Sequence, residues 1–212
     1  MKSKKHLFNV YKVIMDRIIA LLLIIVLIPI FILLSIWIKL DSKGPIFFVQ
    51  KRIGKDQKTF DMIKFRTMKI DTPKNTPTHQ LKNPDQWLTR IGKILRRTSL
   101  DELPQLINII RGEMSFIGPR PALWNQDDLI SEREKYNAHS VKPGITGYAQ
   151  VYGRDTLEIP EKAKLDGYYI DHYSMKLDLK ILIRTILVVL KSDGVIEGGT
   201  GALDPNHKDN KK

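Results

Sequence analysis

The sequence predicts an α+β fold that is mainly helical, with a membrane-embedded N-terminal helix followed by a small cytosolic domain that contains a β-hairpin and interfacial helices. Three observations lead to this prediction. An uncharged apolar run occupies residues 18–38, two short apolar segments flank a polar turn at residues 54–57, and apolar residues recur at helical spacing after Pro104. The chain divides accordingly into an anchor at residues 1–40, a single domain at 41–200 and a polar tail, expected to be flexible, at 201–212.

The apolar run from Ile18 to Ile38 is long enough to cross a hydrocarbon core about 30 Å thick, because a helix rises about 1.5 Å per residue. It is longer than the apolar part of a cleavable signal peptide, about 7 to 15 residues, and no small-residue cleavage site follows it. We therefore expect the segment to remain in the mature protein as a membrane anchor.

Basic residues flank both ends of this run, and Pro29 lies at its centre. Lysine and arginine favour the cytoplasmic side of a membrane, so both ends are expected there. An interior proline removes a backbone hydrogen bond and favours a bend. A re-entrant helix, which breaks at Ile28-Pro29 and leaves on the face where it entered, satisfies both charge clusters, and a tilted single span with a proline kink remains the alternative. The flanking residues are Lys2, Lys4, Lys5, Lys12, Arg17, Lys39, Lys43, Lys51, Arg52, Lys55 and Lys58.

The segment after the anchor predicts a β-hairpin. Gly44-Pro45 opens the apolar stretch at residues 46–49, and a polar turn separates it from Thr59–Phe65. Lys64 and Arg66 would lie at a strand end, where they could equally be solvated residues of a basic edge strand. Residues 71–83 are rich in Pro, Thr and Asn without periodicity, which indicates a mobile loop that is either a lid or a plain surface loop.

Two adjacent carboxylates, Asp101 and Glu102, stand within a strongly basic part of the sequence. One carboxylate can attack phosphorus, its neighbour can hold a divalent cation, and guanidinium groups can bind phosphate oxygens in pairs. The stretch therefore predicts an active site for phosphate chemistry. The basic residues on both sides of it in sequence are Lys64, Arg96, Arg97, Arg111 and Arg120.

The same residues could instead form a capping box, with Ser99 as the N-cap of a helix. Pro104 argues against this alternative, because it would fall where its missing N–H is needed for a backbone hydrogen bond. A helix that starts at Asp101 and ends at Gly112 fits better. Asp101 would then lie at the positive end of the helix, which stabilises its ionised form.

Three later segments carry weaker signals. Residues 115–121 cannot form a regular helix or a central strand, because two prolines bracket Arg120 and hold it on a stiff loop. The glycines of residues 141–154 allow close approach to a ligand but equally serve ordinary tight turns. Residues 177–190 predict an apolar helix, closed by Lys191 and Gly194, that either packs inside the domain or contacts the membrane interface.

Composition limits the functional classes. The net charge of +12 suits anionic lipid headgroups and phosphorylated substrates, although a basic membrane-tethered scaffold or a nucleic-acid-binding protein would carry it too. That alternative leaves Asp101 and Glu102 without a purpose, and aromatic residues interleaved with basic ones, expected for single-strand binding, are not evident. The chain has no cysteine, which excludes thiolate catalysis, and its five histidines are too scattered for a histidine metal site.

Taken in order, the motifs of this chain resemble those of the bacterial sugar transferase family, the small monotopic polyprenyl-phosphate phosphoglycosyl transferases. The resemblance covers nearly the whole chain, and within the family the chain is most similar to single-domain enzymes that begin capsule or exopolysaccharide repeat units. The motifs that carry it are Gly44-Pro45, Lys64–Met68, Ser99–Leu106, Gly118–Pro121, Pro143–Gly147, Leu165–Tyr169 and Leu177–Lys180.

The resemblance implies an enzyme that transfers a sugar 1-phosphate from a UDP-sugar to polyprenyl (undecaprenyl) phosphate. UMP would be released on the cytoplasmic face of the bacterial inner membrane. The resemblance further implies that Asp101 is the nucleophile that forms a covalent phosphosugar intermediate, and that Glu102 coordinates a Mg²⁺ cofactor. The aspartate that matches Asp166 is also tied to activity in the family.

Phosphate binding is the role that the resemblance implies for three basic residues, Lys64, Arg96 and Arg120. Arg96 is preferred to Arg97 because it lies five residues before Asp101. The other expected partners are anionic membrane lipids, without nucleic acid, and a homodimer is one option for the oligomeric state.

The chain departs from the family pattern at three places. Ile28-Pro29 stands where the family often has Ser-Pro, so the serine that could satisfy the freed backbone carbonyl is missing. Tyr148 stands where Trp is common, and Tyr152 and Asp155 stand where Asn is common. These changes leave the sugar open, and a UDP-linked N-acetylated or 6-deoxy amino sugar is the first expectation.

Overall fold

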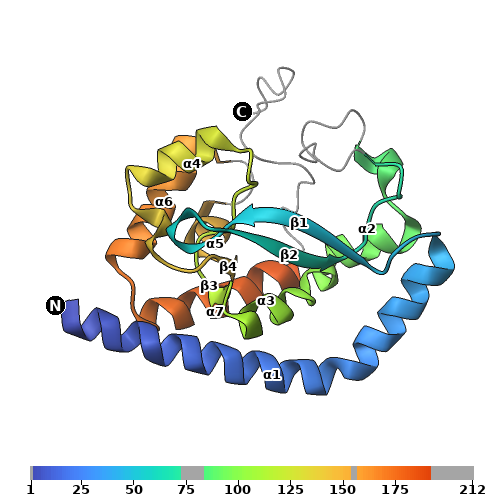
Figure 1. Ribbon diagram of the computed structural model, residues 1–212, viewed down its shortest axis with the longest axis horizontal. Coiled ribbons are helices and arrows are strands. Elements are labelled where there is room, and N and C mark those ends of the chain that lie inside the picture. Colours follow the sequence, from blue (N-terminus) through green and yellow to red (C-terminus); the bar gives the residue numbers. More distant parts are fainter. Residues whose placement is uncertain (1, 73–83, 154–156, 192–212) are drawn as a thin grey trace.

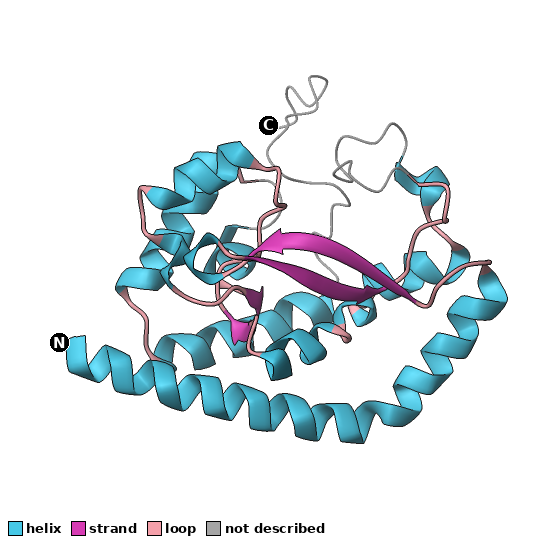
Figure 2. Cartoon of the chain, in the orientation of Figure 1, coloured by secondary structure: helices cyan, strands magenta, loops and turns pink. Residues whose placement is uncertain are grey.

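A computed structural model describes residues 2–72, 84–153 and 157–191, together with the side chains of most of them. The described residues form a mainly helical fold, as predicted, with two small sheets, of which only the hairpin was expected (Figures 1 and 2). The expected loop at 71–83 and the tail at 201–212 fall wholly or largely outside the described residues. In chain order the helices and strands are α1 (Lys2–Asp41), β1 (Phe47–Ile53), β2 (Thr59–Phe65), α2 (Arg90–Arg97), α3 (Gln105–Arg111), β3 (Ser115–Ile117), α4 (Asp127–Glu134), β4 (Gly144–Thr146), α5 (Tyr148–Gly153), α6 (Ile159–Asp171) and α7 (Met175–Lys191), with 3-10 turns η1 (Lys55–Gln57), η3 (Pro84–Trp87), η4 (Leu100–Glu102) and η5 (Ala138–Ser140).

Helix α1 runs along one side of the domain and turns toward α2 in its C-terminal part (Figure 1). The expected break at Ile28-Pro29 is wrong, because the chain stays helical through Pro29. Only one backbone hydrogen bond depends on the missing N–H, so a proline can bend a long helix without interrupting it. By length and composition, the described part Phe8–Asp41 could cross a membrane.

Most apolar side chains of α1 point away from the domain. A smaller set, which includes Ala20, Leu34 and Ile38, is buried against α2, α3 and the hairpin. Exposed apolar area on this scale is unusual for a soluble monomer and marks a surface that meets lipid or protein. The exposed residues are Val10, Tyr11, Ile14, Ile18, Ile19, Leu21, Leu22, Leu23, Ile25, Val26, Ile28, Ile30, Ile32, Leu33, Ile36, Trp37 and Leu40.

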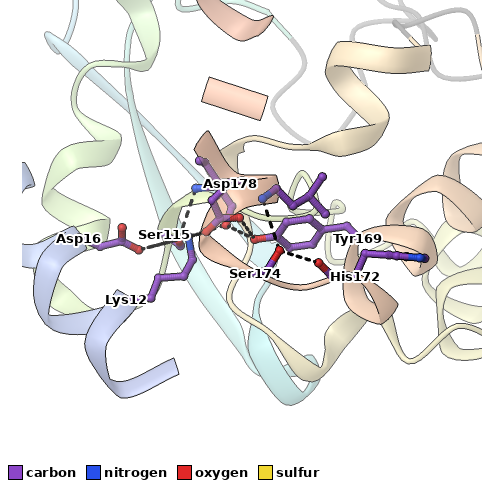
Figure 3. A network of polar contacts seen from close by, with 9 residues as sticks. Lys12, Asp16, Ser115, Tyr169, His172, Ser174 and Asp178 are labelled. Carbon is purple, nitrogen blue, oxygen red and sulfur yellow. Dashed lines mark hydrogen bonds and ion pairs between the residues drawn. The ribbon is translucent and has the colours of Figure 1, made fainter. Parts of the chain in front are cut away.

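Polar contacts tie the N-terminal part of α1 to the domain (Figure 3). The Lys12 ammonium donates to Asp178 of α7 at 2.6 Å. The Ser115 hydroxyl donates to Asp16 at 2.6 Å, which joins α1 to β3. Tyr169 of α6 completes this network, because its hydroxyl donates to Asp178 at 2.7 Å.

The C-terminal end of α1 is held by the same domain. Asp41 accepts a hydrogen bond from the backbone N–H of Ile91 at 3.2 Å. Arg66 donates to the backbone carbonyl of Ser42 at 2.8 Å and to that of Lys43. Gly44 follows with a positive φ of 122°, and an added Cβ would lie only 2.0 Å from the Arg66 guanidinium. Arg66 therefore fixes the exit from the helix rather than lying free on an edge strand.

The predicted β-hairpin is confirmed. Strands β1 and β2 are antiparallel, with Phe47 opposite Phe65 at one end and Ile53 opposite Thr59 at the other. Side chains alternate between the two faces of such a ribbon, and residues opposite each other share a face. The inner face is lined by Phe48, Gln50, Arg52, Phe60, Met62 and Lys64.

Helix α3 lies between α1 and the hairpin. Leu106, Ile109 and the following Met114 pack with Ala20 of α1 and Phe60 of β2 in the hydrophobic core. The helix ends at Gly112, whose φ of 80° suits glycine, as predicted. Its start differs from the expectation, since the α-helix begins at Gln105 and the 3-10 turn η4 precedes it.

Strands β3 and β4 form a short parallel pair that the sequence did not predict. Their backbones meet closely at two glycines: a Cβ on Gly118 would lie 2.4 Å from the carbonyl oxygen of Lys142, and one on Gly144 would lie 2.2 Å from the backbone nitrogen of Gly118. These two glycines therefore allow close contact between two backbone segments, a role that neither alternative for the glycines of residues 141–154 had named.

Helix α7 has both buried and exposed apolar side chains. Ile181 is buried, whereas several other large apolar residues of the helix are exposed, so packing inside the domain covers only part of its apolar surface. Gly194, one of the two residues expected to close the helix, lies outside the described residues. The exposed residues are Met175, Leu179, Leu182, Ile183, Ile186 and Leu187.

Candidate active site

The 3-10 turn η4 carries Asp101 and Glu102 between α2 and α3. Ser99, at the start of the turn, is in the left-handed region with a φ of 56°, and its side chain caps no backbone N–H. The capping box is therefore not formed. Asp101 is buried, with 7% of its surface exposed, and the side chain of Glu102 is 15% exposed.

Asn108 attaches α3, and with it the η4 turn, to strand β2. Its side-chain oxygen accepts from the backbone N–H of Ile63 at 3.0 Å, and its amide donates to the carbonyl of Asp61 at 2.8 Å. The contact with Ile63 lies directly beside Lys64, the next residue of the strand. A buried amide with both ends satisfied fixes the relative position of two elements.

Glu102 is the centre of the charged cluster. Its Oε1 accepts from Lys64 at 2.7 Å and from Arg120 at 2.9 Å. The Lys64 ammonium also lies 4.0 Å from Asp101. The structure therefore brings together four of the predicted site residues, Lys64, Asp101, Glu102 and Arg120.

Burial and charge shift the pKa values of the two carboxyls in opposite directions. Burial raises the pKa of Asp101 to about 6, although Lys64 acts against this rise. The pKa of Glu102 lies well below its usual range: burial alone would raise it, but Arg120 and Lys64 together outweigh that effect. The expectation that a helix terminus would stabilise the Asp101 anion is wrong, because Asp101 precedes the α-helix and desolvation dominates.

Lys64 is itself perturbed by this environment. Burial lowers its pKa, and the attraction of Glu102 opposes that shift. Its side chain is 15% exposed. Lys64 therefore points into the cluster and is not a solvated edge-strand lysine.

Arg96 lies closer to the carboxylates than Arg97 does. Its Nε donates to the hydroxyl of Thr67 at 3.0 Å, and its charge lowers the pKa of Asp101. Arg97 is exposed at the end of α2, and Arg111 is exposed at the end of α3. This placement supports the choice of Arg96.

Arg120 is held by its backbone on the loop that follows β3. The carbonyl of Pro119 accepts from the N–H of Gly144 at 3.0 Å, and the carbonyl of Pro121 accepts from Arg52 at 3.1 Å. Between them, the carbonyl of Arg120 accepts from Arg133 at 2.8 Å. These contacts immobilise the loop, as expected from its two prolines.

Asp166 lies apart from the other predicted site residues. Its Oδ2 accepts from Arg133 Nε at 2.8 Å and from Nη2 at 2.6 Å. Both side chains are almost fully buried, at 1% and 2% exposure. Asp166 is thus connected to the site through Arg133, whose remaining nitrogen supports the backbone of Arg120.

Three residues near the site escaped the sequence reasoning: Arg133, Asn108 and Arg52. Nothing local in the sequence distinguishes Arg133 from a surface arginine of α4. Arg52 could have been found, because strand alternation puts it on the hairpin face that carries Lys64.

The donor set can be tested for a magnesium ion. Within the described residues, no group of three His, Cys, Asp or Glu side chains has the arrangement of a metal site. Magnesium in phosphate-transfer sites usually takes one or two carboxylates, with phosphate oxygens and water completing its shell. Glu102 and Asp101 fit that requirement, and only Oε1 of Glu102 makes the contacts with Lys64 and Arg120.

Paired carboxylates among cations, in an α+β domain that carries a long apolar helix, are the arrangement expected of an enzyme that acts on phosphorylated substrates. Comparison with known proteins narrows the class. Residues 7–192 match the family described as bacterial sugar transferase. The chain belongs to this family.

Similar proteins include several with sugar transferase names. The uncharacterized sugar transferase EpsL of Bacillus subtilis is 42% identical over 158 residues, which cover 74% of this chain and 76% of that protein. The UDP-glucose:undecaprenyl-phosphate glucose-1-phosphate transferase of Xanthomonas campestris is 37% identical over 195 residues, 89% of this chain but 40% of that protein. The exopolysaccharide production protein ExoY of Sinorhizobium fredii is 36% identical over 193 residues, 84% and 85% of the two chains.

Proposed function

We propose that this protein transfers a sugar 1-phosphate from a UDP-sugar to undecaprenyl phosphate and thereby starts the synthesis of a capsule, exopolysaccharide or other glycoconjugate repeat unit. The observation that carries the proposal is the buried pair Asp101 and Glu102, which lies among Lys64, Arg120 and Arg96. The family, and the activity for which the Xanthomonas relative is named, supply the substrate class.

The reaction proceeds in two displacements at one phosphorus. A carboxylate oxygen of Asp101 attacks the sugar-bearing phosphorus, a new O–P bond forms, and the bond to the bridging oxygen breaks so that UMP leaves with the electron pair. A phosphate oxygen of the lipid then attacks the same phosphorus. The bond to Asp101 breaks, the carboxylate is restored, and the sugar is left on a lipid diphosphate.

The protein's own charges support this chemistry. The nucleophile is the ionised form of Asp101, which predominates above its pKa of about 6. Glu102 stays ionised and holds Lys64 and Arg120 in place, where they can bind phosphate oxygens. A low-dielectric surrounding strengthens these interactions as charge develops on the phosphate oxygens.

Magnesium would be held by Glu102, with Asp101 beside it, and would supply neutralisation of the diphosphate charge. In the structure, Lys64 and Arg120 both donate hydrogen bonds to Oε1 of Glu102. Lys64 and Arg120 would bind phosphate oxygens, and the ion would add further positive charge. The negative charges of the carboxylates and the substrate would then be neutralised together.

The two ends of α1 support a re-entrant placement in the bacterial cytoplasmic membrane. Lys12 and Asp41 lie at opposite ends of the apolar part of the helix, yet both contact the same domain. A helix fixed in this way enters the bilayer with its exposed apolar face and keeps both ends on one side. The basic flanks favour the cytoplasmic side, where anionic lipids add attraction.

The proposal is tested by incubating the protein in lipid nanodiscs with a panel of UDP-sugars and undecaprenyl phosphate, and by measuring UMP. We expect UMP release that requires both one of the sugars and the lipid for multiple turnovers. With UDP-sugar alone, mass spectrometry of the intact protein should find a sugar-phosphate adduct on Asp101. A protein that releases no UMP from any UDP-sugar of the panel would contradict the proposed function.

A further inference from the structure

The inner face of the hairpin continues beyond Lys64 toward the turn. Lys64 lies opposite Phe48 on β1, and the next residues of β1 on the same face are Gln50 and Arg52. Arg52 thus joins the site from the β1 side. The proposed function assigns no role to this part of the face.

The guanidinium of Arg52 reaches the loop that carries Arg120. Its Nη1 donates to the carbonyl of Pro121 at 3.1 Å, and its Nη2 donates to the side-chain oxygen of Gln50 at 2.6 Å. A backbone bridge between Arg52 and Leu123 strengthens the same junction. Arg52 is therefore fixed in position by neutral partners on two sides.

One donor of Arg52 is left unsatisfied. Its Nε is buried and has no hydrogen-bond partner among the described residues. No carboxylate of the described chain forms an ion pair with Arg52, whereas Glu102 is already shared by Lys64 and Arg120. Unsatisfied buried donors are rare in native proteins and often indicate a group or solvent molecule that binds there.

The charge around Arg52 favours an anion. Burial, followed by the repulsion of Arg120, lowers the pKa of Arg52 to about 9. Two cations near each other in a poorly solvated place are unfavourable until a negative group is bound between them. Among the described residues, the attractive charge that acts on Arg52 is Glu102, which is already paired with Lys64 and Arg120, so a bound anion would balance the charge of Arg52.

We propose that Arg52, oriented by Gln50, binds the phosphate of the UDP-sugar that leaves with UMP. The inference rests on the proposed function and deepens it. Lys64 and Arg120 surround Glu102 next to Asp101, where the attacked phosphorus must lie. Arg52, whose guanidinium contacts the Arg120 loop at the Pro121 carbonyl, would contact the second phosphate and stabilise the negative charge that it gains when the bridging bond breaks.

Two variants with the same change of charge test this assignment. Arg52→Gln removes the cation from the inner face, and Lys51→Gln removes one from the next residue, which is exposed on the other face. We expect Arg52→Gln in nanodiscs to weaken UMP binding by about 10- to 100-fold and to raise the KM for the UDP-sugar, as for the loss of a charged hydrogen bond. Lys51→Gln should change neither the UMP affinity nor the KM for the UDP-sugar by more than about twofold, because an exposed surface charge contributes little.

Further measurements separate the phosphate from other ligands and from folding. Uridine binding should stay unchanged in Arg52→Gln, because uridine has no phosphate. The KM for undecaprenyl phosphate should also stay unchanged, because Arg52 is assigned to the phosphate of UMP and not to that of the lipid. Arg52→Lys keeps the charge and should recover part of the UMP affinity even if Arg52→Gln folds poorly.

Equal UMP affinity in wild type and Arg52→Gln would overturn the inference. An equal loss of uridine and UMP binding would do the same, because it would mean a general distortion. A raised KM for the lipid alone would move Arg52 to the acceptor phosphate and reject the assignment to UMP. Wild-type protein that neither binds nor releases UMP would overturn the proposed function, and this inference with it.

Discussion

Lys12 and Asp178 form an ion pair of 2.6 Å, although they are 166 positions apart in the sequence. Lys12 precedes the apolar part of α1, and Asp178 belongs to α7 of the domain. Burial raises the pKa of Asp178, and Lys12 acts against that rise. Because Asp41 at the other end of the helix also contacts the domain, both ends of the apolar part of α1 are attached to the same domain.

Topology can be checked by cysteine labelling, since the chain has no cysteine of its own. We expect single cysteines at Ser3 and at Lys43 to resist a membrane-impermeant thiol reagent in intact cells and to react after permeabilisation. Lys43 is preferable to Ser42 because it is exposed, whereas the Ser42 hydroxyl accepts a hydrogen bond from Arg66. Labelling of the Ser3 site alone in intact cells would show that the helix spans the bilayer.

The carboxylate pair gives a second prediction. Asp101→Asn and Glu102→Gln should each lower turnover by at least roughly a thousandfold. The first removes the nucleophile, and the second removes the carboxylate that positions the phosphate-binding side chains of Lys64 and Arg120. UMP release in nanodiscs measures the effect. Asp101→Asn should also abolish the sugar-phosphate adduct.

For Asp101→Asn, the direction of the Asp101 pKa shift argues against unfolding as the cause of the lost activity. A raised pKa means that folding is opposed by the ionised carboxyl at pH 7, and that this cost disappears as pH falls below about 4, the ordinary value. Asp101→Asn removes the buried charge and should melt at the same temperature as wild type or higher. If the variant kept more than about a tenth of the activity, Asp101 would not be the nucleophile.

The pH dependence of the first half-reaction gives a third prediction. With a pKa of about 6, Asp101 is mostly protonated at pH 5 and ionised at pH 7. The value of kcat/KM for the UDP-sugar should therefore rise with pH up to about 6 and level off above it. Glu102 does not titrate in this window, because its pKa lies well below the usual range. A flat profile between pH 5 and 7 would contradict the assignment.

Asp166 gives a fourth prediction, as a positioning residue that acts through Arg133 and Arg120. Asp166→Asn should lower kcat/KM for the UDP-sugar in the wild-type background but have little further effect when Arg120→Ala is already present. Kinetics of the two single variants and the double variant measure this coupling. If the loss of kcat/KM in the double variant equals the product of the losses in the two single variants, Asp166 acts independently of Arg120.

A structural control accompanies this cycle, because a lone buried charge can unfold the domain. Replacing both partners, Arg133→Met with Asp166→Leu, removes the pair without leaving an unpaired charge, and such replacements are often neutral for stability. We expect this double variant to melt near the wild-type temperature and still lose activity, since the carbonyl of Arg120 has lost its donor. Full activity would show that the pair serves stability alone.

The sequence predicted features that depend on local signals. The hairpin follows from two apolar segments around a polar turn, and the end of α3 follows from Gly112. The parallel β3–β4 pair did not emerge, because three-residue strands joined across a long stretch of chain leave no local pattern. Burial is also nonlocal, which explains why the pKa shift of Asp101 was expected in the wrong direction.

The site shows the same division. The adjacent carboxylates and basic residues pointed to Lys64, Glu102 and Arg120, the motif resemblance added their roles, and the fold brings the three into direct contact. It could not reveal that Asp166 reaches the site through a second buried residue. Arg133 has no recognisable signal in the sequence, because its role depends on α4 and α6 lying side by side.

The order in which the contacts of α1 can form follows from the direction of synthesis. Asp41 can meet its partner Ile91 50 residues later, Asp16 must wait for Ser115, 99 residues later, and Lys12 waits 166 residues for Asp178. At a synthesis rate of about 5 to 20 residues per second, the last delay is roughly 8 to 30 s. Until Ser115 and then Asp178 are made, neither of their contacts can hold the N-terminal part of α1, so the C-terminal end of the helix can attach to the domain well before its N-terminal end.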